Sequence, residues 1–160
     1  MDIAVHKEIM PPVRVRRATA EDLDTLVRFN AAMAQETESI TLNPSRLRTG
    51  VAALLQDPSR GFYLVAELGG QVVGQLLITT EWSDWRSAYF WWIQSVYVAP
   101  DHRRRGVYRA LDGHVRAEAQ RRGDVCGIRL YVERDNQIAQ QVYTNLGMVR
   151  SHYDLYESPL

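Results

Sequence analysis

The stretch "VYVAPDHRRRGVYRAL", residues 96–111, joins a strand to a helix through a proline and a run of arginines. β-Branched and aromatic residues precede the proline, and apolar residues at helical spacing follow Gly106. Arg103, Arg104 and Arg105 stand where the helix dipole disfavours cations. The free amides of a first helical turn bind anions, and a glycine lets the backbone approach a phosphate closely. A bound phosphate would resolve the conflict, whereas the alternative is that the arginines simply extend into water.

The composition is that of an ordinary soluble protein. The chain has 160 residues, of which 46% are apolar and 24% are charged, and its formal net charge is zero. This balance gives no argument for nucleic acid or an acidic membrane as partner, and no apolar run reaches the ~18 residues of a membrane span. The single cysteine, Cys126, excludes an internal disulfide framework and a cysteine metal cluster, so no metal site is expected.

The first residues predict the domain organisation. Residues 1–12 lack the apolar core and the small-residue cleavage site of a signal peptide, and they end in two prolines. We therefore expect a flexible leader at residues 1–12, one domain at residues 13–160 and a cytoplasmic protein.

Apolar periodicity along the chain predicts an α/β fold in the order β-α-α-β-β-β-α-β-α-β. Strands are expected at residues 13–18, in a hairpin at 61–82 that turns at Gly69 and Gly70, and at 88–100, 127–134 and 148–157. Helices are expected after a Thr19 cap, after an Asn43 cap, from Gly106 to Gly123 and from an Asp135 cap to Gly147. The strand at 88–100 is apolar on both faces, which indicates a mixed, mostly antiparallel central sheet with helices on both faces.

The spacing around Gly106 differs from the two common nucleotide-binding loops. It contains neither G-x-G-x-x-G after a strand nor Gly-Lys-Ser/Thr. It instead resembles the pyrophosphate-binding motif Gln/Arg-x-x-Gly-x-Gly/Ala of the GNAT (GCN5-related N-acetyltransferase) superfamily, with Arg103 and Gly106 in their places. The later stretch "LYVERDNQIAQQVYTNLGM", residues 130–148, resembles the second signature of that family at Asn136, Ala139, Tyr143, Gly147 and Met148.

The two signatures together cover residues 93–148, with two departures from the family pattern. Met148 stands where the family usually has phenylalanine, and Tyr108 stands where it usually has a second small residue. The Tyr108 ring would either crowd the turn between loop and helix or stack beside the cofactor. The amides that bind phosphate remain, so we expect cofactor binding to survive.

The resemblance implies an N-acetyltransferase that moves an acetyl group from acetyl-CoA to a primary amine of a small molecule or protein, directly in a ternary complex. In the family, two strands splay apart to admit the pantetheine arm, and by position these are the strand ending at Val98 and the strand around Leu130. The implied cofactor contacts are the backbone of Val96 and Val98, the amides of Arg104, Arg105, Gly106, Val107 and Tyr108, the side chains of Arg103 and Arg104, Arg105 or Arg109 at the ribose phosphate, and Asn136 on the cofactor arm.

Tyr143 is the general acid that the resemblance implies. Asn136, Ala139 and Tyr143 share one helical face, so the tyrosine hydroxyl can point at the cofactor sulfur. A backbone N–H of the central strand would stabilise the tetrahedral oxyanion, and Tyr143 would protonate the leaving thiolate. The alternatives are a core tyrosine with a satisfied hydroxyl and an asparagine that bonds its own backbone at a helix start.

No motif identifies the general base. The strand at 88–98 contains no carboxylate, which leaves Glu36 and Glu38, expected in the loop between the first two helices, and Glu81 at a strand end. Each would act directly or through water, and for each the alternative is a solvated surface charge.

Two other function classes remain open. One is a catalytically silent acyl-CoA-binding or sensing module of the same fold, and the other is an interaction domain that binds some other anion through the arginines. The expected partners are acetyl-CoA and an amine acceptor, with no nucleic acid and no membrane. The closing strand at 148–157 and the aromatic residues offer surfaces for a homodimer.

Overall fold

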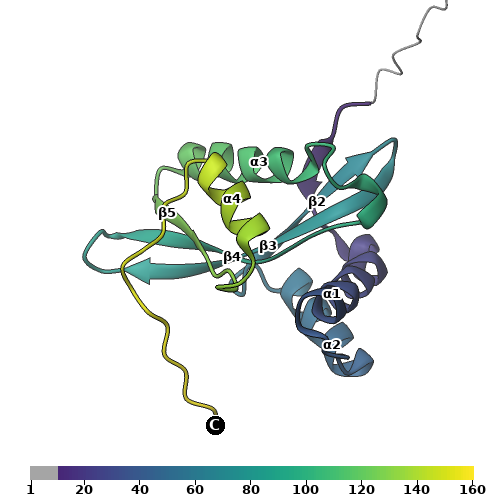
Figure 1. The fold of residues 1–160 in the computed structure, drawn as a ribbon, viewed down its shortest axis with the longest axis horizontal. Helices are drawn as coiled ribbons and strands as arrows, with labels where there is room; N and C mark the ends of the chain where they lie inside the picture. The colour runs from purple at the N-terminus through teal and green to yellow at the C-terminus, as the bar shows by residue number, and fades with distance from the viewer. Residues whose placement is uncertain (1–10) are drawn as a thin grey trace, which may run out of the picture. The chain divides into compact units, whose positions relative to one another are not determined.

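Five strands form one sheet in the order β1-β2-β3-β4-β5 in the computed structural model, which describes residues 11–160 (Figure 1). The first four strands pair antiparallel, and β5 pairs parallel to β4. The strands are β1 (Arg14–Arg17), β2 (Phe62–Leu68), β3 (Gln71–Ser83), β4 (Ala88–Val98) and β5 (Val125–Leu130). The α-helices are α1 (Leu23–Glu38), α2 (Pro44–Gln56), α3 (Val107–Arg122) and α4 (Gln137–Asn145). The predicted α/β class with a mixed, mostly antiparallel sheet is confirmed.

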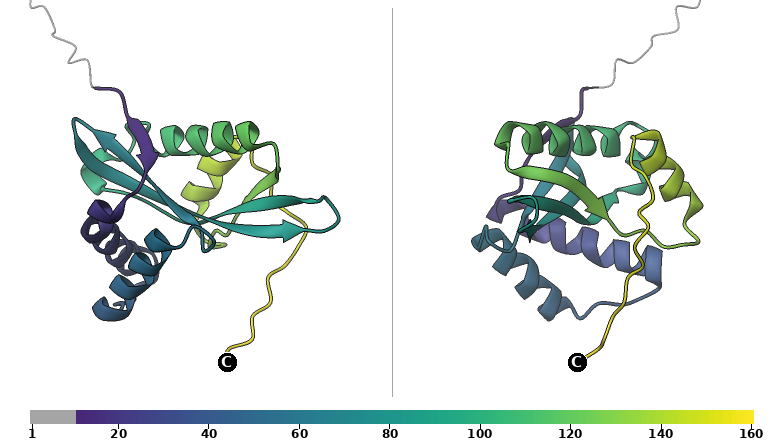
Figure 2. Two further views of the ribbon diagram at one scale, coloured as in Figure 1. Left: turned by 180° about the vertical axis from the view of Figure 1, so that it is seen from behind. Right: turned by 90° about the vertical axis from the view of Figure 1, so that its left-hand side faces the viewer.

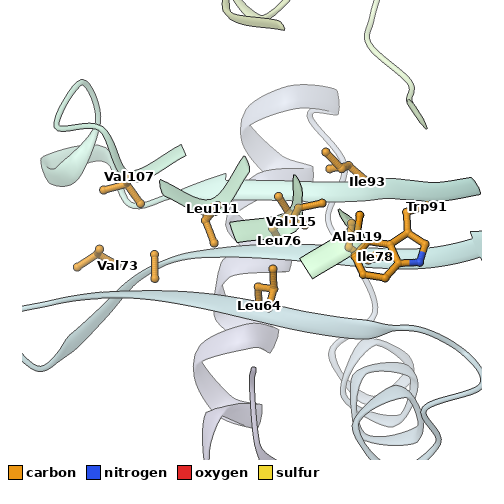
Figure 3. Close-up of a cluster of buried hydrophobic side chains, with 11 residues drawn as sticks. Leu64, Val73, Leu76, Ile78, Trp91, Ile93, Val107, Leu111, Val115 and Ala119 are labelled. Atoms are coloured by element: carbon orange, nitrogen blue, oxygen red, sulfur yellow. The ribbon is translucent and has the colours of Figure 1, made fainter. Parts of the chain in front are cut away.

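The two faces of the sheet are covered by different helices. On one face, α3 packs its apolar stripe against β2, β3 and β4, with Leu111 and Val115 fully buried (Figure 3). On the other face, Leu26 of α1 and Val51 of α2 pack against Tyr63 and Val65. Figures 1 and 2 show α3 and the α1–α2 pair on opposite sides of the strands. The prediction of helices on both faces is confirmed.

The β3–β4 hairpin extends beyond β2 (Figure 2). β2 pairs with β3 only as far as Ile78, whereas β3 and β4 continue to pair as far as Ser83 and Ala88. The hairpin therefore carries Trp82 and Trp85 at its tip, and their side chains are exposed.

A buried ion-pair network fixes the start of α1. Arg16 of β1 donates two hydrogen bonds to the carboxylate of Asp22, at 2.8 and 3.0 Å, and a third to Glu67 of β2 at 2.6 Å. The backbone N–H of Thr19 also donates to Asp22, as the sequence pattern predicts for a capping box. The network joins β1, β2 and the entry to α1.

The end of α1 differs from the prediction. Glu36 and Glu38 lie in the last turns of α1 and not in a loop. No glycine or proline interrupts the segment before Ser39, which ends the helix in a left-handed conformation at φ 56°. Both glutamates are therefore carried on a regular helix.

The chain forms two compact units, one that ends at Leu130 and one that comprises Tyr131–Leu160. In the second unit, α4 is capped by Asn136 and not by Asp135, because the Asn136 Oδ1 accepts the Ala139 N–H at 3.0 Å. The strand predicted at residues 148–157 is wrong: those residues form no strand, and Val149 and Tyr153 are exposed. Alternation supplies an apolar face, but a strand also requires hydrogen bonds to a neighbour.

The remaining sequence expectations concern the leader and membranes. The leader expected at residues 1–12 falls, up to residue 10, outside the described residues. Within residues 11–160, the helices are too short or too polar to cross a membrane. The same residues hold no group of three His, Cys, Asp or Glu side chains arranged for a metal ion.

Candidate functional site

The central strand β4 loses its β5 partner halfway along its length. β4 and β5 pair from Tyr89 to Ile93, and Ile93 opposite Leu130 is the last pair. The register with β3 shifts at the same point, since Ser95 lies opposite Leu77 while Ile93 lies opposite Ile78. Gln94 is thus a β-bulge, a feature that often ends strand pairing beside functional sites. Within the unit that ends at Leu130, residues 95–98 pair with β3 alone, and on their other edge the Val98 carbonyl accepts a hydrogen bond from Arg103 Nε at 2.9 Å.

The loop after β4 has the geometry of an anion site. It passes through a short 3-10 turn at Pro100–His102 and enters α3 at Val107. Arg104 and Gly106 have positive φ, at 60° and 79°, which is uncommon for a non-glycine residue such as Arg104. Left-handed residues alternating with others turn successive N–H groups towards one concavity, and the first turn of α3 adds its own free amides. The loop fits a phosphate group.

Gly74, which none of the sequence motifs includes, lets α3 lie close to the sheet. A Cβ at this position would lie 3.0 Å from Val107 Cγ1 and 3.2 Å from the Tyr97 carbonyl oxygen. A side chain at this position would therefore require Val107 or the β4 backbone to move by a few tenths of an ångström, and glycine allows the close approach of α3 without that shift. A glycine inside a strand pattern was the available signal.

Side chains of the loop point in two directions. Val107 is buried in the cluster under α3 (Figure 3), and Tyr108 packs against the same cluster. The Tyr108 ring therefore lies against the core, which accounts for a large residue where the family pattern has a small one. The arginines predicted at the site have exposed side chains: Arg103, Arg104, Arg105 and Arg109.

Glu36, Tyr97 and Arg103 form a hydrogen-bonded group at the end of β4. The buried Tyr97 donates its hydroxyl proton to Glu36 Oε1 at 2.9 Å, and Arg103 Nη2 donates to Glu36 Oε2 at 2.6 Å. Arg103 Nε also donates to the Val98 carbonyl oxygen at 2.9 Å. Hydrogen bonding to Arg103 lowers the pKa of Glu36 below its ordinary value, and Tyr97 acts in the same direction. Burial and the neighbouring carboxylate raise the pKa of Tyr97.

Glu81 lies on β3 close to the point where β4 and β5 separate. Its carboxylate accepts hydrogen bonds from the Trp92 indole and, at 3.3 Å, from Arg129. Trp92 and Arg129 are themselves the pair next to the last one between β4 and β5. The third carboxylate candidate, Glu38, is exposed at the end of α1.

The two predicted residues of the second signature lie on or beside α4. The side-chain oxygen of Asn136 caps α4 by accepting the Ala139 N–H, and its Nδ2 group can donate to another acceptor. Burial raises the pKa of the Tyr143 hydroxyl above its ordinary value. The hydroxyl is therefore protonated at neutral pH, as a general acid must be.

Comparison with known proteins identifies relatives over most of the chain. The family model described as "Acetyltransferase (GNAT) family" matches residues 28–148. A solved structure of a possible acetyltransferase from Clostridium difficile 630 is 40% identical, with a TM-score of 0.88 over 92% of this chain and 97% of that one.

More distant structures share the fold. A ribosomal-protein-alanine N-acetyltransferase from Brucella melitensis biovar Abortus 2308 is 19% identical, with a TM-score of 0.74, over 93% of this chain and 100% of that one. The aminoglycoside N-acetyltransferase AAC(6')-Iy, solved in complex with CoA, is 14% identical, with a TM-score of 0.76, over 92% of this chain and 95% of that one.

Proposed function

Because the chain belongs to the acetyltransferase (GNAT) family, we propose that it transfers an acetyl group from acetyl-CoA to a primary amine in a ternary complex. One observation carries the proposal: β4 loses its β5 partner at Ile93, and the loop that follows has positive φ at Arg104 and Gly106 before it enters α3, a conformation that suits an anion. A CoA molecule has an amide-bearing arm joined to a pyrophosphate. The unpaired backbone and the loop present complementary groups in that order.

The cofactor half of the site is built mostly from backbone. Under this proposal, the backbone of Val96 and Val98 pairs with the pantetheine amides, and the amides of residues 104–108 hold the pyrophosphate with Arg103 and Arg104. Arg105 or Arg109 contacts the ribose phosphate, and Asn136 contacts the arm through its free amide group. The exposure of the four arginines supports these contacts, since each guanidinium can reach an anion in solvent.

The chemical half of the site needs an acid, a base and an oxyanion donor. Tyr143 serves as the acid that protonates the departing thiolate, and a backbone N–H of residues 94–98 stabilises the oxyanion. Among the three carboxylates, Glu81 is favoured as the base because it bonds Trp92 and Arg129, the pair next to the last one between β4 and β5, whereas Glu36 bonds Tyr97 further along β4. A lowered pKa makes a carboxylate a weaker base, which also argues against Glu36 in that role.

The experiment that tests this function measures free thiol released from acetyl-CoA across a panel of amines. Thiol release above background with one class of amine supports the enzyme. Binding of CoA by calorimetry without thiol release from any amine supports the silent acyl-CoA-binding module instead. Equal binding of CoA and inorganic phosphate would favour the anion-binding domain. Fractionation of cells and sedimentation of the purified protein test the accompanying proposals of a cytoplasmic location and a homodimer.

Glu81→Gln is expected to lower kcat/KM by about 100-fold, because a positioned general base contributes at least that factor. The measurement is kcat/KM for the amine, obtained from the rate of thiol release. Glu36→Gln and Glu38→Gln, assayed in parallel, rank the three carboxylates. A larger loss at either of them would move the base away from Glu81.

Gly106→Val is expected to weaken CoA binding by about 10-fold, since a β-branched residue at a positive φ of 79° costs ~1–2 kcal/mol. The effect comes from the backbone, because a Cβ at Gly106 meets no atom within 4 Å. Calorimetry with CoA measures it. Gly113→Ala is the control, because Gly113 lies inside α3 in open space, where alanine is the better helix former. Equal affinity of the two variants would contradict the role of the loop conformation.

A further inference from the structure

Arg103 is engaged by protein groups on the side that faces α1. Its Nε donates to the Val98 carbonyl and its Nη2 donates to Glu36, which ties the end of α1 to the cofactor loop. A guanidinium carries five N–H donors, and the Nη1 group of Arg103 makes no hydrogen bond within residues 11–160. The side chain is thus held between a carboxylate of the protein and the loop that fits a phosphate.

We propose that Arg103 is exchanged between two anions, Glu36 in the free protein and the pyrophosphate of CoA in the complex, so that cofactor binding releases Glu36 to receive the acceptor amine. This inference rests on the proposed function and adds a role for Glu36. It makes Glu36 a carboxylate that binds the acceptor ammonium group. It also couples the two substrates, because Glu36 is neutralised by Arg103 until the cofactor is present.

The strengths of the two interactions favour the exchange. The side chains of Arg103 and Glu36 are 44% and 40% exposed, and ion pairs in such positions are weak. Pyrophosphate offers more charge and more acceptor oxygens, and charge-assisted bonds from arginine to phosphate are among the stronger hydrogen bonds. The neighbouring Arg104 and Arg105 raise the local positive potential further, so the pyrophosphate is the better partner.

Tyr97 keeps Glu36 in place when Arg103 leaves. Its hydroxyl donates to Glu36 Oε1, the oxygen that Arg103 does not use. The Tyr97 ring is 7% exposed and packs against Phe29 of α1, with ring centroids 5.2 Å apart. The carboxylate therefore stays at the end of β4 with Oε2 freed for a cationic ligand. An amine acceptor, protonated before reaction, has the matching charge.

The test is calorimetry of CoA and of inorganic pyrophosphate with four forms of the protein: wild type, Glu36→Gln, Arg103→Ala and the double variant. Glu36→Gln should bind both probes ~2–5-fold more tightly, because the anion no longer competes with a carboxylate for Arg103. Arg103→Ala should bind ~10-fold more weakly. In the Arg103→Ala background, Glu36→Gln should have no effect on either affinity.

Glu38→Gln is the matched control, since it removes the same charge from the same helix turn without touching Arg103. Its affinities should equal those of wild type. Unchanged or weaker binding by Glu36→Gln, or a tightening that persists without Arg103, overturns the exchange. If either of these results is found while the wild type binds CoA, the exchange is wrong and the proposed function is unaffected. Absence of CoA binding by wild type would overturn both.

The acceptor role of Glu36 has a separate kinetic readout. With the best amine of the panel, Glu36→Gln should raise KM for the amine by ~10-fold and leave kcat within ~2-fold, because it removes binding and not chemistry. An unchanged KM would reject the acceptor role. A loss confined to kcat would return Glu36 to the position of a general base.

Discussion

Replacement of Tyr143 by phenylalanine is expected to lower turnover by about 100-fold or more, the lower range of general acid catalysis. Burial raises the pKa of this hydroxyl, which keeps it protonated and able to donate a proton to the thiolate. Phenylalanine retains the ring and its packing, so affinity for acetyl-CoA should change little. The measurements are kcat from thiol release and the dissociation constant of CoA from calorimetry.

The control for Tyr143→Phe is the same substitution at Tyr153, whose side chain is 73% exposed in the same part of the chain. It removes one hydroxyl from the surface and should leave kcat as in wild type. If Tyr143→Phe turns over acetyl-CoA at the wild-type rate, Tyr143 is not the acid. A parallel loss of CoA affinity and kcat would instead indicate that the hydroxyl helps to hold the cofactor.

Asp22→Asn is expected to lower the free energy of unfolding by about 2–3 kcal/mol at neutral pH, because it removes the buried carboxylate of the pair and leaves the half-buried Arg16 guanidinium, among the described residues, with Glu67 as its remaining charged partner. Asp22 is 6% exposed and receives two hydrogen bonds from Arg16 and one from the Thr19 backbone. The expected loss is smaller than the ~3–5 kcal/mol typical of breaking a fully buried ion pair, because the Arg16 side chain is 30% exposed and can be hydrated again. Urea denaturation followed by circular dichroism measures it.

The penalty of Asp22→Asn should also depend on pH. Arg16 lowers the pKa of Asp22 in the folded state, so the folded protein binds fewer protons than the unfolded chain around and below pH ~4. The contribution of Asp22 is therefore complete above the unfolded pKa and is lost as the pH falls through the folded value. The difference from wild type should be largest above pH ~5 and should shrink towards pH ~3.

Asp24→Asn is the matched control for Asp22→Asn. Asp24 forms an ion pair with Arg48, but its side chain is 81% exposed, so its loss should cost less than ~1 kcal/mol. Equal losses at the two positions, or a penalty at Asp22 that does not change with pH, would contradict a stabilising role for the buried pair.

Local sequence patterns predicted most of the fold. The Asn43 cap, the Gly69–Gly70 turn and the Gly123 stop all lie where the structure has element ends, because each depends on one or two residues and their backbone preferences. The loop of residues 99–106 could be proposed as a phosphate site for the same reason, since its arginines and Gly106 are contiguous. Patterns of this kind do not require knowledge of distant contacts.

The features that escaped prediction depend on long-range contacts. The bulge at Gln94 is a property of register between two strands, and no residue type marks it. Glu36 and Arg103 are 67 positions apart, and only the fold shows that Arg103 donates a hydrogen bond to the Glu36 carboxylate. The prediction of a strand at residues 148–157 was wrong for a related reason. The alternation of apolar and polar residues is present, but a strand forms only where a neighbouring strand pairs with the segment.

The unpaired edge of β4 has a consequence for how this protein tolerates sequence change. Val96 and Val98 pack their side chains against the core under α3, while the groups proposed to meet the cofactor belong to the backbone. Any substitution that preserves the strand leaves those groups in place, and only proline deletes an N–H. Glu81, Glu36 and the exposed arginines have no such protection, because each acts through its side chain. Under the proposed function, divergence can therefore change these side-chain contacts while the backbone contacts to the acyl donor are retained.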